Sequence, residues 1–112
     1  MGGVVRSSFG KPLVIVRYTT VMAANATLNI LPIWPVLGFG TVRIFTESDV
    51  AFTVNLLEKQ RLGTFRQTNS QAVAAATGAP LEFVLVGEYI RIQVVNGGTA
   101  MGRFVLLAGL YP

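Results

Sequence analysis

The chain has 112 residues and a net charge of +4; hydrophobic residues make up 52% of it and charged residues 12%. It holds neither cysteine nor histidine, which excludes disulfides, thiol nucleophiles, Ser-His-Asp triads and zinc or other histidine metal sites. Proteins average about 25% charged residues, so one domain of this length has few charges to cover its surface. We therefore expect partner proteins to cover part of it.

The N-terminal segment, MGGVVRSSFGKP, holds three glycines and one proline. This composition predicts a flexible arm over residues 1–12, followed by a single domain over residues 13–112. The arm lacks the apolar core of a secretory signal. Residues 18–42 carry no charge, but Pro32, Pro35 and several polar side chains make them poor material for a membrane-spanning helix. We expect no membrane span.

The first half of the domain reads as short strands. Residues 13–20 predict one strand and residues 24–30 a weaker one. Residues 31–40 contain two prolines, which remove hydrogen-bond donors from a sheet, so they predict an apolar loop around Trp34. The next strand, residues 41–46, is expected to place Val42 and Ile44 on one face and Arg43 and Phe45 on the other.

The middle of the chain is more polar. Residues 47–49 predict a turn, and residues 51–58 a strand that points Phe52, Val54 and Leu56 inward. Residues 59–63 then read as a connection, 64–67 as a short edge piece and 68–71 as another turn. The alanine-rich residues 71–77 are too short to form a helix alone.

The last stretch, residues 81–112, gives the strongest local signal. Two apolar arms flank Asn-Gly-Gly-Thr at residues 96–99, a sequence typical of tight hairpins whose turns require positive φ. The second arm is apolar on both sides. One face carries Phe104, Leu106, Ala108 and Leu110, and the other carries Val105, Leu107 and Tyr111. We expect the second of these faces to contact something other than water.

Together these segments predict an all-β fold, a single antiparallel β-sandwich of seven to eight strands, of which the jelly roll is one form. Alternation of apolar and polar residues does not distinguish a sandwich from a closed barrel, so the barrel stays open as an alternative.

The order of several segments resembles small β-sandwich domains in virion proteins of tailed bacteriophages, which occur in capsid decoration (cement) proteins and in fibres. The resemblance rests on Gly38-Phe39-Gly40 before a strand, Tyr89-Ile90-Arg91-Ile92 within a strand, and Asn96-Gly97 after it. It spans roughly residues 35–110. Residues 57–61 depart from the Ser-Asp-Gly turn that is frequent in that family.

The resemblance implies a non-enzymatic virion protein of the capsid surface or tail, made in the host cytoplasm, without cofactor or metal. It implies a homo-oligomer, a trimer, that contacts the major capsid protein or another virion protein and cements the shell. The residues we choose as oligomer or partner contacts are Trp34, Phe39, Arg43, Arg91, Val105, Leu107 and Tyr111. The alternative function is a tail, neck or fibre module that binds a partner protein or, through Trp34, carbohydrate.

Other functions have weaker support. Glu47 and Asp49 are close enough for a glycosidase pair or a calcium site, but acids in a turn are common and solvate it. Arg43 beside Phe45 and Arg91 beside Tyr89 would form a platform for single-stranded nucleic acid only if their strands were neighbours on one face. The nine cations are scattered, so we expect no specific nucleic acid.

Overall fold

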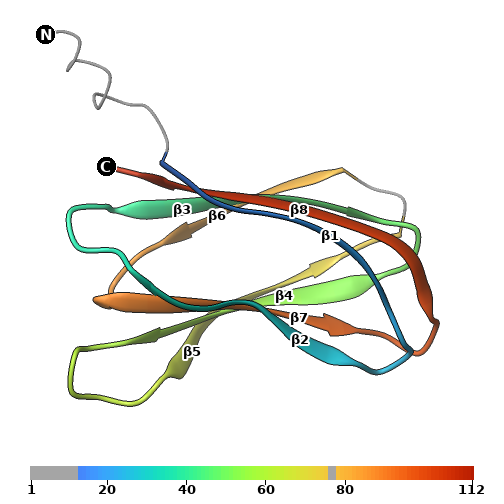
Figure 1. Ribbon diagram of the computed structural model, residues 1–112, viewed down its shortest axis with the longest axis horizontal. Helices are drawn as coiled ribbons and strands as arrows, with labels where there is room; N and C mark the ends of the chain where they lie inside the picture. The colour runs from blue at the N-terminus through green and yellow to red at the C-terminus, as the bar shows by residue number, and fades with distance from the viewer. Residues whose placement is uncertain (1–12, 76–77) are drawn as a thin grey trace, which may run out of the picture.

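The computed structural model describes residues 13–75 and 78–112, and the elements in these ranges are all strands (Figure 1). They are β1 (Leu13–Met22), β2 (Thr27–Pro35), β3 (Thr41–Ser48), β4 (Phe52–Lys59), β5 (Arg66–Val73), β6 (Ala79–Val84), β7 (Tyr89–Asn96) and β8 (Met101–Tyr111). The arm predicted over residues 1–12 lies outside the described residues. None of the described residues builds a helix of the length and apolar character needed to span a membrane.

Two antiparallel sheets of four strands face each other, which confirms the predicted all-β sandwich (Figure 1). The strand order is β1-β8-β3-β6 in one sheet and β2-β7-β4-β5 in the other. The pairs β1 with β8, β2 with β7, β3 with β6 and β4 with β5 are nested, as if one long hairpin had been wrapped across both sheets. Each sheet therefore combines strands from both ends of the chain.

The core lies between the sheets and follows the period-two alternation of the sequence. Val42 and Ile44 of β3 are buried, as predicted, and face Phe52, Val54 and Leu56 of β4 across the sandwich. The inward row of β8, Phe104, Leu106, Ala108 and Leu110, is fully buried as well. The rings of Phe52 and Phe104 meet edge to face with their centroids 5.3 Å apart, the geometry that aromatic pairs prefer.

The hairpin predicted at residues 96–99 is wrong. Strands β7 and β8 lie in opposite sheets and do not pair with each other, so residues 97–100 cross between the layers. Neither Gly97 nor Gly98 has positive φ; the described residues that do are Asn25 and Gly38. The apolar faces of β7 and β8 are buried against each other, which a flat hairpin would prevent because its arms share one sheet.

Asn96 has a different role from the expected turn residue. It is 3% exposed, and its side-chain amide donates to the carbonyls of Ala23 and Thr99, both at 2.9 Å, while its oxygen accepts from Gly97 at 2.8 Å. The backbone N–H of Asn25 donates to the carbonyl of Gly97 at 2.7 Å. Asn96 thus fastens the β1–β2 loop to the β7–β8 crossing.

Two further predictions are corrected. Residues 31–35 are not loop: β2 continues to Pro35, with register shifts that accommodate the prolines. Residues 68–71 are not a turn but the middle of β5. Both β2 and β5 are edge strands, where missing donors are tolerated and polar side chains can face water on both sides.

Candidate interaction surface

The outer face of the β1-β8-β3-β6 sheet gathers the side chains that alternate with its core row. On β3, Arg43, Phe45 and Glu47 point outward between buried neighbours. On β8 the outward residues include Val105, Leu107 and Tyr111. The cross-strand register pairs Phe45 with Leu107. Four of the seven predicted contact residues, Arg43, Val105, Leu107 and Tyr111, therefore share one face.

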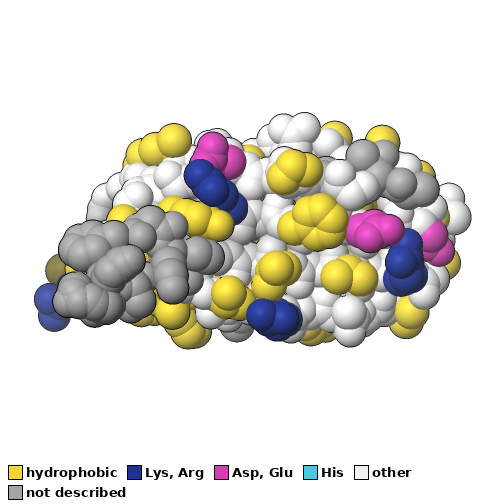
Figure 2. All heavy atoms as spheres, turned by 90° about the horizontal axis from the view of Figure 1, so that it is seen from above, with side chains coloured by type: hydrophobic (Ala, Val, Ile, Leu, Met, Phe, Trp, Pro, Cys, Tyr) yellow, Lys and Arg dark blue, Asp and Glu magenta, His cyan; other side chains and the backbone are white. Residues whose placement is uncertain are grey.

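The centre of this face is apolar. Phe45 and Leu107, in the middle row, are 42% and 38% exposed; Val14 and Val84, nearer the end that holds Tyr111, are 44% and 68% exposed. We call the surface formed by Val14, Phe45, Val84, Val105, Leu107 and Tyr111 the apolar face. Figure 2 shows hydrophobic side chains across its middle, with a cation beside an acid toward each end. Apolar side chains grouped in this way on a sheet differ from the single exposed hydrophobic residues that any protein carries.

Two ion pairs flank the apolar centre. The Arg43 Nε donates to Glu82 Oε2 at 2.8 Å, and the Arg103 Nη2 donates to Glu47 Oε2, also at 2.8 Å. The bond to Glu82 raises the pKa of the Arg43 guanidinium above its ordinary value. Because these pairs are largely exposed, they add little to the stability of the fold. Their clearer effect is to place charges of both signs at fixed positions around the apolar face.

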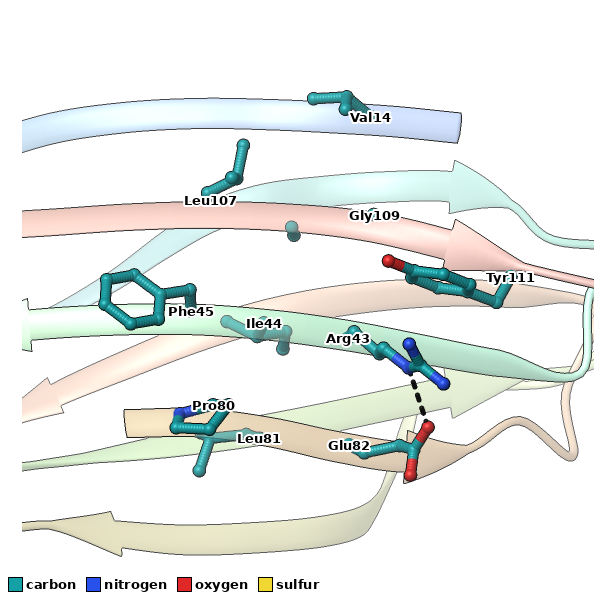
Figure 3. A pocket seen from close by; sticks show the side chains of 11 residues that line it. Val14, Arg43, Ile44, Phe45, Pro80, Leu81, Glu82, Leu107, Gly109 and Tyr111 are labelled. Atoms are coloured by element: carbon teal, nitrogen blue, oxygen red, sulfur yellow. Dashed lines mark hydrogen bonds and ion pairs between the residues drawn. The ribbon is translucent and has the colours of Figure 1, made fainter. Parts of the chain in front are cut away.

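A groove of about 500 Å³ opens on the same face (Figure 3). It lies where β8 carries Gly109, whose missing side chain leaves a hollow between Val14 on β1 and Arg43 on β3. The guanidinium of Arg43 lies 4.0 Å from the centre of the Tyr111 ring, a cation–π contact. Figure 3 shows Arg43 and Tyr111 at one end of the groove and Phe45 and Leu107 at the other.

The other three predicted contact residues lie elsewhere. Trp34 and Phe39 are half-buried and pack against the core. Arg91 is on β7, in the second sheet, where its guanidinium lies 4.4 Å from the ring centre of Phe65. Since β3 and β7 are in opposite sheets, Arg43 and Arg91 do not form the shared platform that nucleic-acid binding would require.

The outer face of the second sheet is chemically different. A ladder of polar side chains crosses all four strands: Ser70 donates to Asn55 at 2.8 Å, Asn55 to Gln93 at 3.3 Å, and Gln93 to Asn29 at 3.1 Å. We call this row the polar ladder. Its members hydrogen-bond one another, and their remaining amide groups can bond water or a polar ligand.

The five acids all have structural partners. Glu47 and Glu82 are in the ion pairs described above, and Glu88 accepts the N–H of Arg61 at 2.6 Å. Asp49 accepts the backbone N–H groups of Gly102 and Arg103. Glu58 is 3% exposed and accepts from Thr68, Val86 and Gly87. In the described ranges no three acids group into a metal-binding cluster.

Sequence reasoning missed Val14, Phe45 and Val84 of the apolar face, and Glu82 and Gly109 of its groove. The signal for Phe45 was present, because it shares the outward parity of Arg43 on one strand. Gly109 was also readable, since a glycine inside a strand often marks a close approach or a hollow. Glu82 could not be found because its place opposite Arg43 depends on which strands pair.

Comparison with known proteins found a matching family model and several solved structures with a similar fold. A family model described as the uncharacterised protein YqxG N-terminal domain matches residues 44–110. No curated protein matches the sequence. Among solved structures, the PBSX exported protein XepA superposes with a TM-score of 0.75 at 20% identity, over 91% of this chain and 37% of that one. The present chain thus spans little more than a third of XepA.

Two shorter proteins also share the fold. The Yersinia pseudotuberculosis-derived mitogen superposes with a TM-score of 0.68 at 12% identity, covering 90% of this chain and 88% of the mitogen. The SPBc2 prophage-derived protein YomS gives 0.51 at 11% identity, covering 85% of this chain and 93% of YomS. At such identities these likenesses establish the β-sandwich fold and nothing finer.

Proposed function

This chain belongs to the family of the uncharacterised protein YqxG N-terminal domain, and we propose that it is a non-enzymatic structural protein of a bacteriophage particle. Within that role it is a decoration (cement) subunit, which associates with itself and with the major capsid protein or another virion protein. Its mechanism is the burial of apolar sheet surface between proteins, without a chemical step.

The observation that carries the proposal is the apolar face. Four strands about 4.8 Å apart, each about eight residues long at about 3.3 Å per residue, present roughly 500 Å². At about 25 cal/mol per Å² of apolar surface, covering that area contributes at most about 12 kcal/mol, and less because the two ion pairs occupy part of it. Association costs about 4–15 kcal/mol, so the face is large enough for specific contact and small enough to need more than one contact in an assembly.

The fold supports the same function. The nested order of strands supports the jelly-roll form of the sandwich, on which viral capsid domains and lectins are built. XepA and YomS, which share the sandwich, are by name a PBSX exported protein and a prophage-derived protein. The five acids are engaged in holding loops and framing the face, which favours structure over catalysis.

The test is co-fractionation. Particles produced by the strain that carries the gene are banded in a density gradient, and the chain is expected to migrate with them. Phe45→Glu, which puts a charge in the centre of the apolar face, should leave the particle fraction. Leu62→Glu makes the same kind of change at a side chain that is 96% exposed in the β4–β5 loop, and it should stay bound. A wild-type chain that never bands with particles would rule the proposal out.

Position on the particle distinguishes the two forms of the proposal. Labelled antibody should decorate the shell if the chain is a cement protein, and the tail if it is a neck or fibre module. For the second form, the polar ladder is the observation that favours carbohydrate, because amide rows can match sugar hydroxyls. Trp34 packs against the core and is a poorer candidate. Reproducible glycan-array binding that Gln93→Ala abolishes would favour this alternative.

A further inference from the structure

The order of side chains on the apolar face points to one occupant, and we propose that it is a second copy of this chain, related by a two-fold axis. The inference rests on the proposed function, since it takes the apolar face to be a protein contact, and it names the partner. The axis lies between the two faces and runs across the strands at the row that contains Phe45 and Leu107.

Charge order on β3 is the first argument. Its outward residues read Arg43, Phe45, Glu47, so the two charges lie at equal steps on either side of Phe45. A two-fold rotation about the axis that crosses β3 at Phe45 reverses the direction of the strand. It brings Arg43 of each copy over Glu47 of the other, so the interface contains this contact twice. An isologous contact needs a surface that is complementary to itself. The outward row of β3 meets this requirement in its charges.

Shape on β8 gives the second argument independently. About Leu107, the residues two steps away are Val105 on one side and Gly109 on the other. The same rotation therefore places Val105 of one copy over the hollow that Gly109 leaves in the other (Figure 3). A side chain meets a gap on both sides of the axis, as interdigitating sheets require.

The outermost row agrees with this arrangement. Arg103 of one copy comes over Tyr111 of the other, where a guanidinium can stack on the ring. Arg17 on the edge strand β1, in register with Leu107, comes toward Arg17 of the other copy, which is a contact between like charges. Its side chain is exposed at the rim of the sheet and can turn its charge into solvent.

A rotation about an axis parallel to the strands makes a poorer match. It would bring β8 of one copy over β3 of the other, and so set Glu47 against Val105 and Arg43 against Gly109. Neither contact satisfies a charge. With about 500 Å² on each copy, the pair lies near the lower limit for a specific interface, and we expect micromolar association.

The test uses charge reversal and sedimentation velocity on the full chain, at concentrations from about 1 to 100 μM. The wild-type chain should sediment as a monomer–dimer equilibrium. Arg43→Glu sets an acid against Glu47 of the other copy at each of the two contacts, and Glu47→Arg sets a base against Arg43 at each. Each variant should weaken association by about tenfold or more. Arg61→Glu, in the β4–β5 loop, changes the charge equally and should leave association unchanged.

Mixing the two variants separates a contact from a folding defect. An Arg43→Glu copy and a Glu47→Arg copy oppose acid to base on both sides of the axis, so an equimolar mixture should associate more strongly than either variant alone. Residues 43 and 47 are about 13 Å apart on one strand, too far to affect each other within a copy at ordinary salt. Circular dichroism and a urea melt on each variant check that it is folded.

Several results would overturn the two-fold pair: a wild-type monomer over the whole range, a trimer, variants that associate like the wild type, or folded variants whose mixture stays monomeric. A monomer that still bands with particles would remove this inference and leave the proposed function standing. Loss of particle binding with an intact dimer would do the reverse.

Discussion

Glu58 and Gly87 lie directly against each other at the open end of the β4–β7 pair. The buried Glu58 carboxylate accepts the backbone N–H of Gly87 at 2.8 Å, and a Cβ built on Gly87 would lie 2.9 Å from the Glu58 Cβ and 3.0 Å from the Lys59 carbonyl oxygen. The same carboxylate accepts the N–H of Val86 at 2.8 Å. One side chain thus satisfies the turn between β6 and β7, which joins the two sheets.

Gly87→Ala should destabilise the fold by about 2 kcal/mol, because backbone atoms surround the new methyl group and cannot give way as a flexible side chain would. The matched control is Gly98→Ala, where nothing lies within 4 Å of the added Cβ. The free energy of unfolding in urea measures both. Equal effects at the two positions would show that the turn at Gly87 relaxes freely.

Asn96→Ala should cost about 2 kcal/mol, since it leaves carbonyls of two loops without a donor in a buried place. The control is Asn29→Ala, which removes an exposed end of the polar ladder and should change the unfolding free energy by less than about 0.5 kcal/mol. If the Asn96 variant is as stable as the wild type, water replaces the amide and the two loops are not fastened by it.

Thr46→Val should stabilise the protein by about 1 kcal/mol. Thr46 is fully buried on β3, and its hydroxyl has no hydrogen-bond partner among the described residues. Valine has nearly the same shape and removes the cost of burying the hydroxyl. Thermal unfolding of this variant beside Thr53→Val, at a half-buried position, measures the difference; a lower midpoint for Thr46→Val would contradict the prediction.

Asp49 should give the fold a measurable acid sensitivity. Partial desolvation on its own would raise the pKa of Asp49, but the backbone N–H groups of Arg103 and Gly102 outweigh it and hold the pKa below its ordinary value of 3.8. A carboxyl whose pKa is lower in the folded state contributes stability that is fully present above the unfolded pKa. That contribution is lost as the pH falls through the folded pKa.

Asp49→Asn removes this titration. The wild type should therefore be more stable than the variant near neutral pH, and the difference should shrink as the pH falls below about 4. Urea melts of both proteins from about pH 7 to pH 2 follow the difference directly. A gap between the two that stays constant over this range would mean that the carboxylate gains nothing from its two backbone donors.

The sequence was sufficient for the all-β fold and the inward faces of its strands, because β3 and β7 alternate strictly, but alternation alone did not distinguish a sandwich from a barrel. Val42, Ile44 and Phe45 could be assigned to faces by parity alone, and the structure keeps that assignment. The apolar outer side of β8 was visible for the same reason, in Val105 and Leu107. Where one face of a strand must be buried, a shift of one residue would expose the whole core row, so the pattern is strongly constrained.

The sequence was not sufficient where the structure of a segment depends on which strands pair in the folded protein. Asn96-Gly97 has the composition of a hairpin turn, but the chain buries β7 against β8 across the sandwich. Strand β5 was divided between an edge piece and a turn because Val73 is its one buried residue, so it shows no apolar alternation. The groove depends on the register that pairs Gly109 of β8 with Arg43 of β3, and the sequence of neither strand predicts that register.

Chemical cross-linking at Leu107 tests the central claim most directly, because the chain contains no cysteine and one introduced thiol reports one position. Packed sheets lie about 10 Å apart, so a bismaleimide of about that span should join two copies of Leu107→Cys into a species of twice the 12.0 kDa chain mass. Leu62→Cys, in the exposed β4–β5 loop, should stay monomeric under the same conditions. A Leu107→Cys chain that is no more cross-linked than Leu62→Cys would contradict the account.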